Sequence, residues 1–230
     1  MENQWHDKAK SKWDDTADSW HSRTTSMWEK GSRKDIIPFF TKHISAESHV
    51  VDLGCGDGYG SYLLYKNGYS VVGMDLSDQM VSLAKKNETE GLSFLQGDLA
   101  ALPFQNYQFN AAMAINSLEW TKDPLHSLRE IHRILHPDGS LLLGILGPTA
   151  HPRSNSLPRL RGEEVICNTM MPWECKQLAE EEGFTLKGEA WVWKESVPKQ
   201  VREMDMPAEL KQALTFMTLL LFQKGVIGNG

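Results

Sequence analysis

The chain has 230 residues, of which 40% are hydrophobic and 23% are charged, and this composition predicts one ordinary globular domain. Its formal net charge of −6 argues against a general nucleic-acid binder, because neutralising phosphates requires an excess of basic residues. Since the 3 cysteines suit neither a disulfide framework nor a zinc site, and no apolar run reaches the roughly 20 residues of a membrane span, we expect a cytoplasmic protein.

The elements predicted after residue 49 alternate between strands and helices. Runs of apolar residues have the length and composition of strands at residues 50–53, 70–75, 92–96, 109–115 and 140–146. Helical patterns lie between them at residues 59–67, from the N-cap Ser77 to about 87, and at 125–135, which the turn Pro137-Asp138-Gly139 follows. This alternation implies a parallel sheet with right-handed crossovers.

The last third of the chain has a different order of elements. A helix at residues 172–182 is followed by two long strand patterns, 184–193 and 215–223, with a short helix at 208–213 between them. We expect the two strands to form an antiparallel pair at one sheet edge. The predicted fold is therefore a doubly wound, seven-stranded, mostly parallel α/β sheet of the Rossmann-like type.

A glycine-rich loop connects the first predicted strand to the first helix after it. Its sequence is Asp52-Leu53-Gly54-Cys55-Gly56-Asp57-Gly58. A nicotinamide dinucleotide site needs G-x-G-x-x-G, but the third glycine position is Tyr59 in one register and Ser61 in the other. The acid at the start of the loop also suits a positively charged ligand better than a pyrophosphate. S-adenosylmethionine (SAM), with its sulfonium and ammonium groups and no phosphate, fits this charge.

Two further acids follow the next two strands. Asp75 ends the second strand, 21 residues after Gly54, where a carboxylate can accept hydrogen bonds from ribose hydroxyls. Asp98 ends the third strand, where it could accept a hydrogen bond from an adenine amino group. Three acids at successive strand ends, in register with the loop, predict a nucleoside-binding edge.

With these residues the sequence resembles the class I SAM-dependent methyltransferase family, and within it the small-molecule type similar to ubiquinone-biosynthesis methyltransferases. The resemblance extends over about Asp35 to Leu146 and includes the Pro137-Asp138-Gly139 turn. It implies that Asp52, Gly54 and Gly56 hold the methionine moiety.

The resemblance also implies roles for the remaining cofactor residues. Asp75 would hold the ribose and Asp98 with Leu99 the adenine, while Arg33 would meet the SAM carboxylate. Leu76 and Met80 would flank the adenine ring. Where family members often have a histidine after the fourth strand, this chain has Asn116-Ser117-Leu118-Glu119-Trp120; we include Asn116 among the cofactor residues and assign no catalytic residue.

The N-terminal segment carries four tryptophans at spacings close to two helical turns: Trp5, Trp13, Trp20 and Trp28. If the segment is helical, the rings form one stripe, which could pack on the domain, contact a ligand, or do both. We predict that residues 1–48 form a helical lid segment over the cofactor and that residues 49–230 form the SAM-binding domain.

Other polar residues have two possible roles. Glu119 could be a general base or cation-binding group in the active-site mouth, or a solvated loop residue. His132 and His136 lie on a predicted helix without the H-E-x-x-H pattern, so we predict no metal and assign them to the helix dipole. A basic cluster after the fifth strand could bind an anionic substrate or lie in a solvated loop: Arg153, Arg159 and Arg161.

The function predicted from these features is transfer of the SAM methyl group to a small-molecule acceptor. The motif Asn-Pro-Pro-Tyr, associated in the family with amino groups of bases or glutamine, is missing after the fourth strand, which argues against a nucleic-acid substrate. The alternatives are a SAM-binding module without turnover, a macromolecule-directed methyltransferase and, against the glycine spacing, a nicotinamide oxidoreductase. The acceptor, the methylated atom and the oligomeric state are left open.

Overall fold

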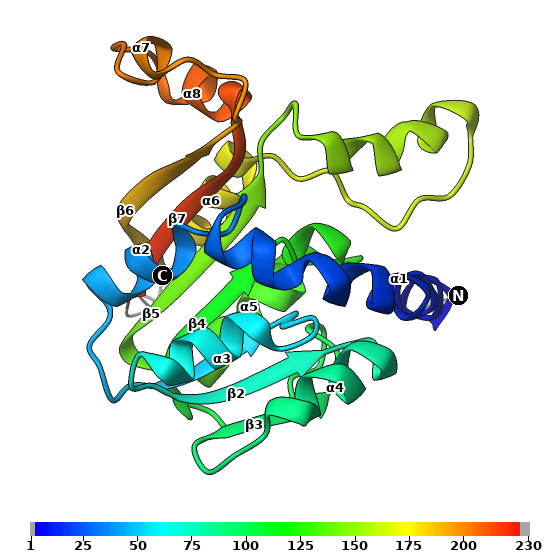
Figure 1. Ribbon diagram of the computed structural model, residues 1–230, viewed down its shortest axis with the longest axis vertical. Coiled ribbons are helices and arrows are strands. Elements are labelled where there is room, and N and C mark those ends of the chain that lie inside the picture. Colours follow the sequence, from blue (N-terminus) through cyan, green and yellow to red (C-terminus); the bar gives the residue numbers. More distant parts are fainter. Residues whose placement is uncertain (1–2, 226–230) are drawn as a thin grey trace.

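The computed structural model describes residues 3–225, in which seven strands form one sheet of order β3-β2-β1-β4-β5-β7-β6 (Figure 1). The strands are β1 (His49–Leu53), β2 (Ser70–Asp75), β3 (Leu92–Gln96), β4 (Phe109–Ile115), β5 (Leu135–Leu146), β6 (Phe184–Trp193) and β7 (Thr215–Lys224). The first five pair in parallel, so the doubly wound fold predicted from the sequence is confirmed.

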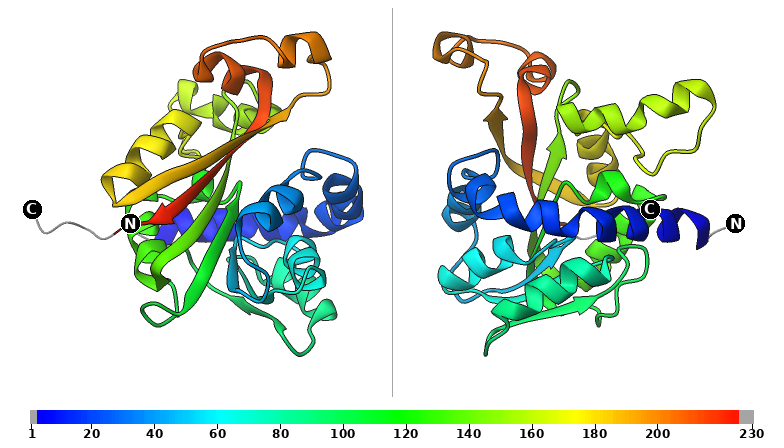
Figure 2. Two further views of the ribbon diagram at one scale, coloured as in Figure 1. Left: turned by 90° about the vertical axis from the view of Figure 1, so that its left-hand side faces the viewer. Right: turned by 45° about the vertical axis from the view of Figure 1, so that its right-hand side comes forward.

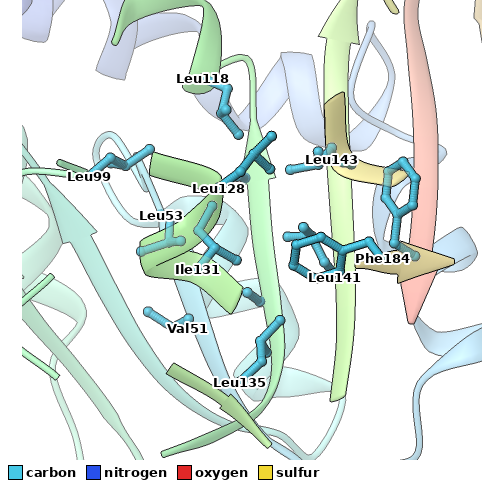
Figure 3. Packing of buried hydrophobic residues seen from close by; sticks show 14 of the residues in the cluster. Val51, Leu53, Leu99, Leu118, Leu128, Ile131, Leu135, Leu141, Leu143 and Phe184 are labelled. Carbon is cyan, nitrogen blue, oxygen red and sulfur yellow. The ribbon is translucent and has the colours of Figure 1, made fainter. Parts of the chain in front are cut away.

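Helices cover both faces of the sheet. The principal helices are α1 (Asn3–Glu29), α2 (Ile36–His43), α3 (Tyr59–Lys66), α4 (Asp78–Ala84), α5 (Pro124–Ile134) and α6 (Pro172–Glu181). Side chains of α5 and α6 pack with one face of the sheet, where Leu128, Ile131 and Leu143 are fully buried (Figure 3). Side chains of α2, α3 and α4 pack with the other face. No helix within residues 3–225 is both long and apolar enough to span a membrane.

The predicted antiparallel pair, β6 and β7, is confirmed at one end of the sheet. β7 runs antiparallel to both of its neighbours, with Leu220 opposite Leu143 of β5 and Leu219 opposite Ala190 of β6. Because β6 is reversed relative to β7, it runs in the same direction as β1 to β5. Only β7 is reversed within the described sheet, and the connection between β6 and β7, which contains α7 (Lys199–Arg202) and α8 (Ala208–Leu214), lies beyond the carboxyl ends of the parallel strands (Figure 1).

The start of β5 differs from the prediction. The strand begins at Leu135, directly after α5, and not at residue 140 after a turn. Leu135 pairs with Phe109, and a register shift follows before Ser140 pairs with Ala111. Asp138 has φ 61° within this irregular stretch, so the Pro-Asp-Gly sequence forms a bulge inside the strand and does not separate the helix from it.

The N-terminal segment consists of two helices with different surroundings. α2 belongs to the core, since Ile36 and Phe40 are fully buried among side chains of β1, β2 and α3. α1 lies across the carboxyl edge of the sheet, the edge at which the parallel strands end (Figure 2). Only α1 therefore lies over the edge where open α/β sheets bind ligands.

Candidate functional site

A cavity of about 480 Å³ lies at the carboxyl edge, between the strand ends and α1. Its size falls in the range of small-molecule sites. Its lining includes all ten residues that the sequence predicts for the cofactor: Arg33, Asp52, Gly54, Gly56, Asp75, Leu76, Met80, Asp98, Leu99 and Asn116. The fold thus brings together residues from five separate segments of the chain. These are the turn after α1 and the four segments at the carboxyl ends of β1, β2, β3 and β4.

The glycine loop turns sharply after β1 and packs against neighbouring segments. Gly54 has φ 76°, and its N–H donates to the carbonyl of Met74 at 2.7 Å. A Cβ on Gly54 would lie 2.5 Å from the Cβ of Ser117, so a larger residue would push the loop away from the segment after β4. Gly56 has φ 56° and approaches the indole nitrogen of Trp20. Both positions require glycine, because the backbone has a positive φ there and because neighbouring side chains lie where a Cβ would be.

Asp52 is buried at the base of the cavity. Its carboxylate accepts a hydrogen bond of 2.6 Å from Ser61 Oγ. Desolvation by burial raises the pKa of Asp52 to about 7, although the Ser61 hydrogen bond and the nearby Arg33 guanidinium act in the opposite direction. The carboxyl group therefore favours a cationic ligand that would replace its lost solvation.

Asp75 fixes the glycine loop to the start of α4. One oxygen accepts from the N–H of Gly56 at 2.8 Å, and the other accepts from the N–H of Ser77 at 2.9 Å. Ser77 is the N-cap of α4, as predicted, since its Oγ accepts from the N–H of Met80 at 3.1 Å. Burial raises the pKa of Asp75, while the backbone donors lower it. Each oxygen keeps a lone pair for a further donor.

Two histidines of α1 contact acids of the sheet edge, and the sequence alone does not predict either contact. His6 Nδ1 lies 2.9 Å from Asp98 Oδ2, at the end of β3. His21 Nδ1 lies 2.7 Å from Oδ2 of the buried Asp57 in the glycine loop, and Thr24 donates to the other oxygen at 3.1 Å. No local sequence pattern marks these pairs, because each joins residues far apart in the chain.

Arg33 is a buried cation at the opposite end of the site from Asp98. Desolvation lowers its pKa to about 10, and among the nearby acids Asp52 opposes this shift most. The guanidinium lies over the rings of Trp20, at 4.8 Å, and Trp28, at 5.8 Å. Within residues 3–225 it forms no ion pair, and its side-chain hydrogen bond goes to Asn116 Oδ1 at 3.4 Å.

The tryptophans of α1 lie in different surroundings, some at the cavity and some in the core or at a neighbouring segment. Trp13, Trp20 and Trp28 line the cavity. Trp28 also packs in the core against Gly60, where a Cβ would lie 2.4 Å from the indole. Trp5 does not line the cavity; its Nε1 donates to the carbonyl of Trp120.

Glu119 has neither of the roles that the sequence suggests. It is fully buried, so it is not a solvated loop residue, and it does not line the cavity, as a general base would. Its Oε1 accepts from the N–H of Leu146 at 2.7 Å, and burial raises its pKa. Glu119 therefore joins η2 (Leu118–Trp120) to the end of β5.

The other polar candidates also lie outside the cavity. Arg153 is buried in η3 (His151–Arg161) and donates to backbone carbonyls, including that of Met170 at 2.8 Å. His132 lies in α5 but His136 lies in β5, so the two do not share a helix and the helix-dipole interpretation is wrong for His136. Within the described part of the chain, no group of His, Cys, Asp and Glu is arranged to hold a metal ion.

The fold and the glycine loop match known proteins. Residues 51–143 match a family model described as a methyltransferase domain. A malonyl-[acyl-carrier protein] O-methyltransferase from Erwinia pyrifoliae is 33% identical over 97 residues, which cover 42% of this chain and 37% of the relative. A demethylmenaquinone methyltransferase from Lactococcus lactis is 32% identical over 153 residues, which cover 63% of this chain and 57% of the relative. The match thus spans less than two thirds of either relative.

Solved structures are similar over most of the chain. A chain of the complex between the Haloferax volcanii Trm112 methyltransferase activator and a methyltransferase has a TM-score of 0.70 at 23% identity, covering 93% of this chain and 97% of that one. A SAM-dependent methyltransferase from Methanosarcina mazei has a TM-score of 0.64 at 20% identity, covering 82% and 97%. These similarities show the fold. The chain therefore has the fold of class I SAM-dependent methyltransferases, and its residues 51–143 are similar to a methyltransferase domain.

Proposed function

We propose that this protein binds SAM in the cavity beneath α1 and transfers its methyl group to a small-molecule acceptor. The observation that supports this most directly is the convergence of three carboxylates and one buried guanidinium on a single cavity at the carboxyl edge. SAM supplies a methyl group on a sulfonium, a strong electrophile that needs no protein nucleophile. The protein would contribute orientation and the exclusion of water.

The charges of the cavity fit the parts of SAM. Arg33, buried and without an ion pair among residues 3–225, would receive the carboxylate of the methionine moiety. Asp52, at the other side of the loop, would lie near the cationic groups. Asp75 has lone pairs left for the ribose hydroxyls, and Asp98 would accept from the adenine amino group after exchanging or sharing its contact with His6.

We propose that α1 is the lid of this site. It supplies Trp13, Trp20 and His6 to the cavity, and it covers the carboxyl edge along its length (Figure 2). This lid is shorter than the segment 1–48 predicted from the sequence, because α2 is part of the core. Closing α1 over the cavity would exclude water from the reacting groups.

The small-molecule acceptor and the cytoplasmic location are parts of the same proposal. The cavity beneath α1 has the volume of a small-molecule site, and the net charge of −6 disfavours nucleic acid. The relatives named above are methyltransferases of malonyl-[acyl-carrier protein] and demethylmenaquinone. Cys55, Cys167 and Cys175 are free buried thiols, as in proteins of reducing compartments.

Calorimetry with SAM, S-adenosylhomocysteine and NADH tests the cofactor assignment. We expect the two adenosyl ligands to bind and NADH not to bind; binding of NADH alone would overturn the proposal. Incubation with SAM and a panel of metabolites, followed by mass spectrometry, tests turnover. Binding without any methylated product across a broad panel would instead favour a SAM-binding module.

A further inference from the structure

Asp57 is a buried acid of the glycine loop that does not line the cavity. It stands between Gly56 and Gly58, both of which have a positive φ, and only 2% of its surface is exposed. A carboxylate is costly to bury unless hydrogen bonds replace its lost solvation. The function of this acid therefore follows from the groups that bind it.

Both oxygens of Asp57 are bound by α1. His21 Nδ1 lies 2.7 Å from Oδ2, and the hydroxyl of Thr24, which is itself buried, donates to Oδ1 at 3.1 Å. Because a carboxylate oxygen only accepts, the His21 contact is a hydrogen bond when Nδ1 carries the proton. Among residues 3–225 the Asp57 side chain has no other hydrogen-bond partner, so the lid helix satisfies an acid that belongs to the loop.

The glycine loop is thereby held from two sides. Asp75 accepts from the N–H of Gly56 at 2.8 Å and holds the loop beside α4, while the next residue, Asp57, holds it to α1. A glycine has no side chain with which to fix its own backbone, so the position of Gly56 depends on these neighbours. Gly56 lines the cavity, whereas His21 and Thr24 do not. These two residues of α1 can therefore act on the cofactor site through the loop, without touching the ligand.

The residues that follow on both segments continue this attachment. The hydroxyl of Tyr59 donates to Glu29 at 2.8 Å, and a Cβ on Gly60 would lie 2.4 Å from the Trp28 indole. The last turns of α1 thus contact residues 57–60 at successive points. Asp57 is the point in this series that lies next to a residue of the cavity.

The charge of Asp57 by itself would act in the opposite direction. Desolvation lowers the pKa of Arg33 to about 10, and Asp57 is one of the acids that oppose this shift. A carboxylate near Arg33 weakens the attraction between Arg33 and the carboxylate of a bound ligand. Replacing the donors on α1 leaves the Asp57 carboxylate in place, so variants of α1 separate its hydrogen bonds from its charge.

We propose that Asp57 is a positioning residue that couples the closure of α1 to cofactor binding. His21 and Thr24 hold the helix on the glycine loop, and the loop in turn presents Gly56 to the ligand. Because such coupling is reciprocal, cofactor binding also stabilises α1 over the cavity. This inference rests on the proposed function, since it concerns the lid and the cofactor assigned there.

His21 is the best position for the test, because 46% of its side chain is exposed and its replacement leaves the core intact. Calorimetry measures the affinity for S-adenosylhomocysteine, and urea unfolding measures stability. We expect His21→Ala to bind this ligand at least about fivefold more weakly. His21→Asn, whose amide N–H can take the place of Nδ1–H, should restore the affinity to within about twofold. The neighbouring Ser22 is exposed and bonded to its own helix, so Ser22→Ala should leave the affinity unchanged.

A double-mutant cycle tests whether the effect passes through Asp57. In protein that carries Asp57→Ala, the further change His21→Ala should not weaken binding, because the contact is already lost. Thr24 provides a second pair of variants if Asp57→Ala does not fold. Thr24→Val, which loses the hydroxyl, should weaken binding at least about threefold, and Thr24→Ser should keep it within about twofold.

Three results would overturn the coupling: unchanged affinity in His21→Ala and Thr24→Val, no recovery in His21→Asn and Thr24→Ser, or the same loss from His21→Ala with and without Asp57. A contact that serves stability alone gives the first of these results together with a lower free energy of unfolding. If S-adenosylhomocysteine does not bind to the unmodified protein, the proposed function fails and the coupling fails with it. If it binds and the variants have no effect, only the coupling fails.

Discussion

The indole nitrogen of Trp5 donates a hydrogen bond of 2.9 Å to the carbonyl oxygen of Trp120, which joins the first turn of α1 to η2. At the other end of the helix, Trp28 packs in the core against Gly60 of α3. Between these two points, Asp14 accepts hydrogen bonds from Ser77 Oγ and the N–H of Gln79 at the start of α4. α1 is thus attached to segments on both sides of the cavity.

Deleting residues 1–20 should leave a folded protein that binds S-adenosylhomocysteine at least about tenfold more weakly and has lost turnover. The deletion removes Trp13 and Trp20 from the cavity but keeps Trp28, which belongs to one of the two hydrophobic clusters. Circular dichroism and calorimetry measure the two effects together. The exposed Ser22, bonded only to its own helix, gives a control in Ser22→Ala, which should change neither. Unfolding of the truncated protein, or unchanged affinity, would contradict the lid.

Asp75→Ala should weaken S-adenosylhomocysteine binding by about one hundredfold, because charge-assisted hydrogen bonds contribute about 1.5–3 kcal/mol each. The variant also loses the bonds that Asp75 accepts from Gly56 and Ser77, so part of the loss is a looser loop. Asp138→Asn is the control: Asp138 is exposed, and asparagine tolerates its φ of 61° better than alanine does. Similar affinities for the two variants would rule out the ribose assignment.

SAM affinity should rise between pH 6 and pH 8 and level off above the pKa of Asp52, about 7. Burial raises this pKa from its usual 3.8, so between these two values the ligand-free folded protein holds a proton that the unfolded chain does not, and its stability falls as pH rises towards 7. A cationic ligand favours the ionised carboxylate, so binding below pH 7 should release a proton. Calorimetry in buffers of different ionisation enthalpy measures that release, and Asp52→Asn should abolish it. Binding without proton release at pH 6 would contradict the role of Asp52.

Glu119→Gln should retain turnover with an unchanged pH profile, because Glu119 does not line the cavity and the amide oxygen can still accept from Leu146. Glu119→Ala should destabilise the protein by about 2 kcal/mol, since it leaves a buried N–H unpaired and opens space in the core. Urea unfolding gives the free energies of both variants. A glutamine variant that folds normally but is inactive would restore the general-base interpretation.

Most strands could be predicted to within a residue or two from their apolar runs. β2, β3, β4 and β6 begin and end where the sequence indicates. β2, β3 and β4 are short, mainly apolar segments between turn residues, whereas β6 is a longer strand that begins after the turn at Gly183. β5 could not be predicted in full, since its first residues pair through a bulge that depends on the register with β4. That register is set by tertiary packing, which local propensity does not contain.

The cofactor residues could be placed because strand-end acids in a parallel sheet meet at one edge whatever their distance in the chain. The contacts that α1 makes with this edge could not be placed in the same way. His6 with Asp98 and His21 with Asp57 depend on the angle at which the helix crosses the sheet. The burial of Glu119 could not be predicted for a related reason. Whether a loop carboxylate is solvated or buried depends on which segments pack over the loop.

The reversal of β7 has a consequence for how this protein can change over evolution. Because β6 and β7 are joined at the carboxyl edge, the connection with α7 and α8 extends from the same side as the segment after β5, which supplies Pro152. Exchanges in the segment after β5 can change the lining of the cavity directly, because this segment supplies part of that lining. The acids at β1, β2 and β3 lie across the topological switch between β1 and β4, so such exchanges leave them in place. New specificities can therefore arise here by exchange of one surface segment, without redesign of the sheet.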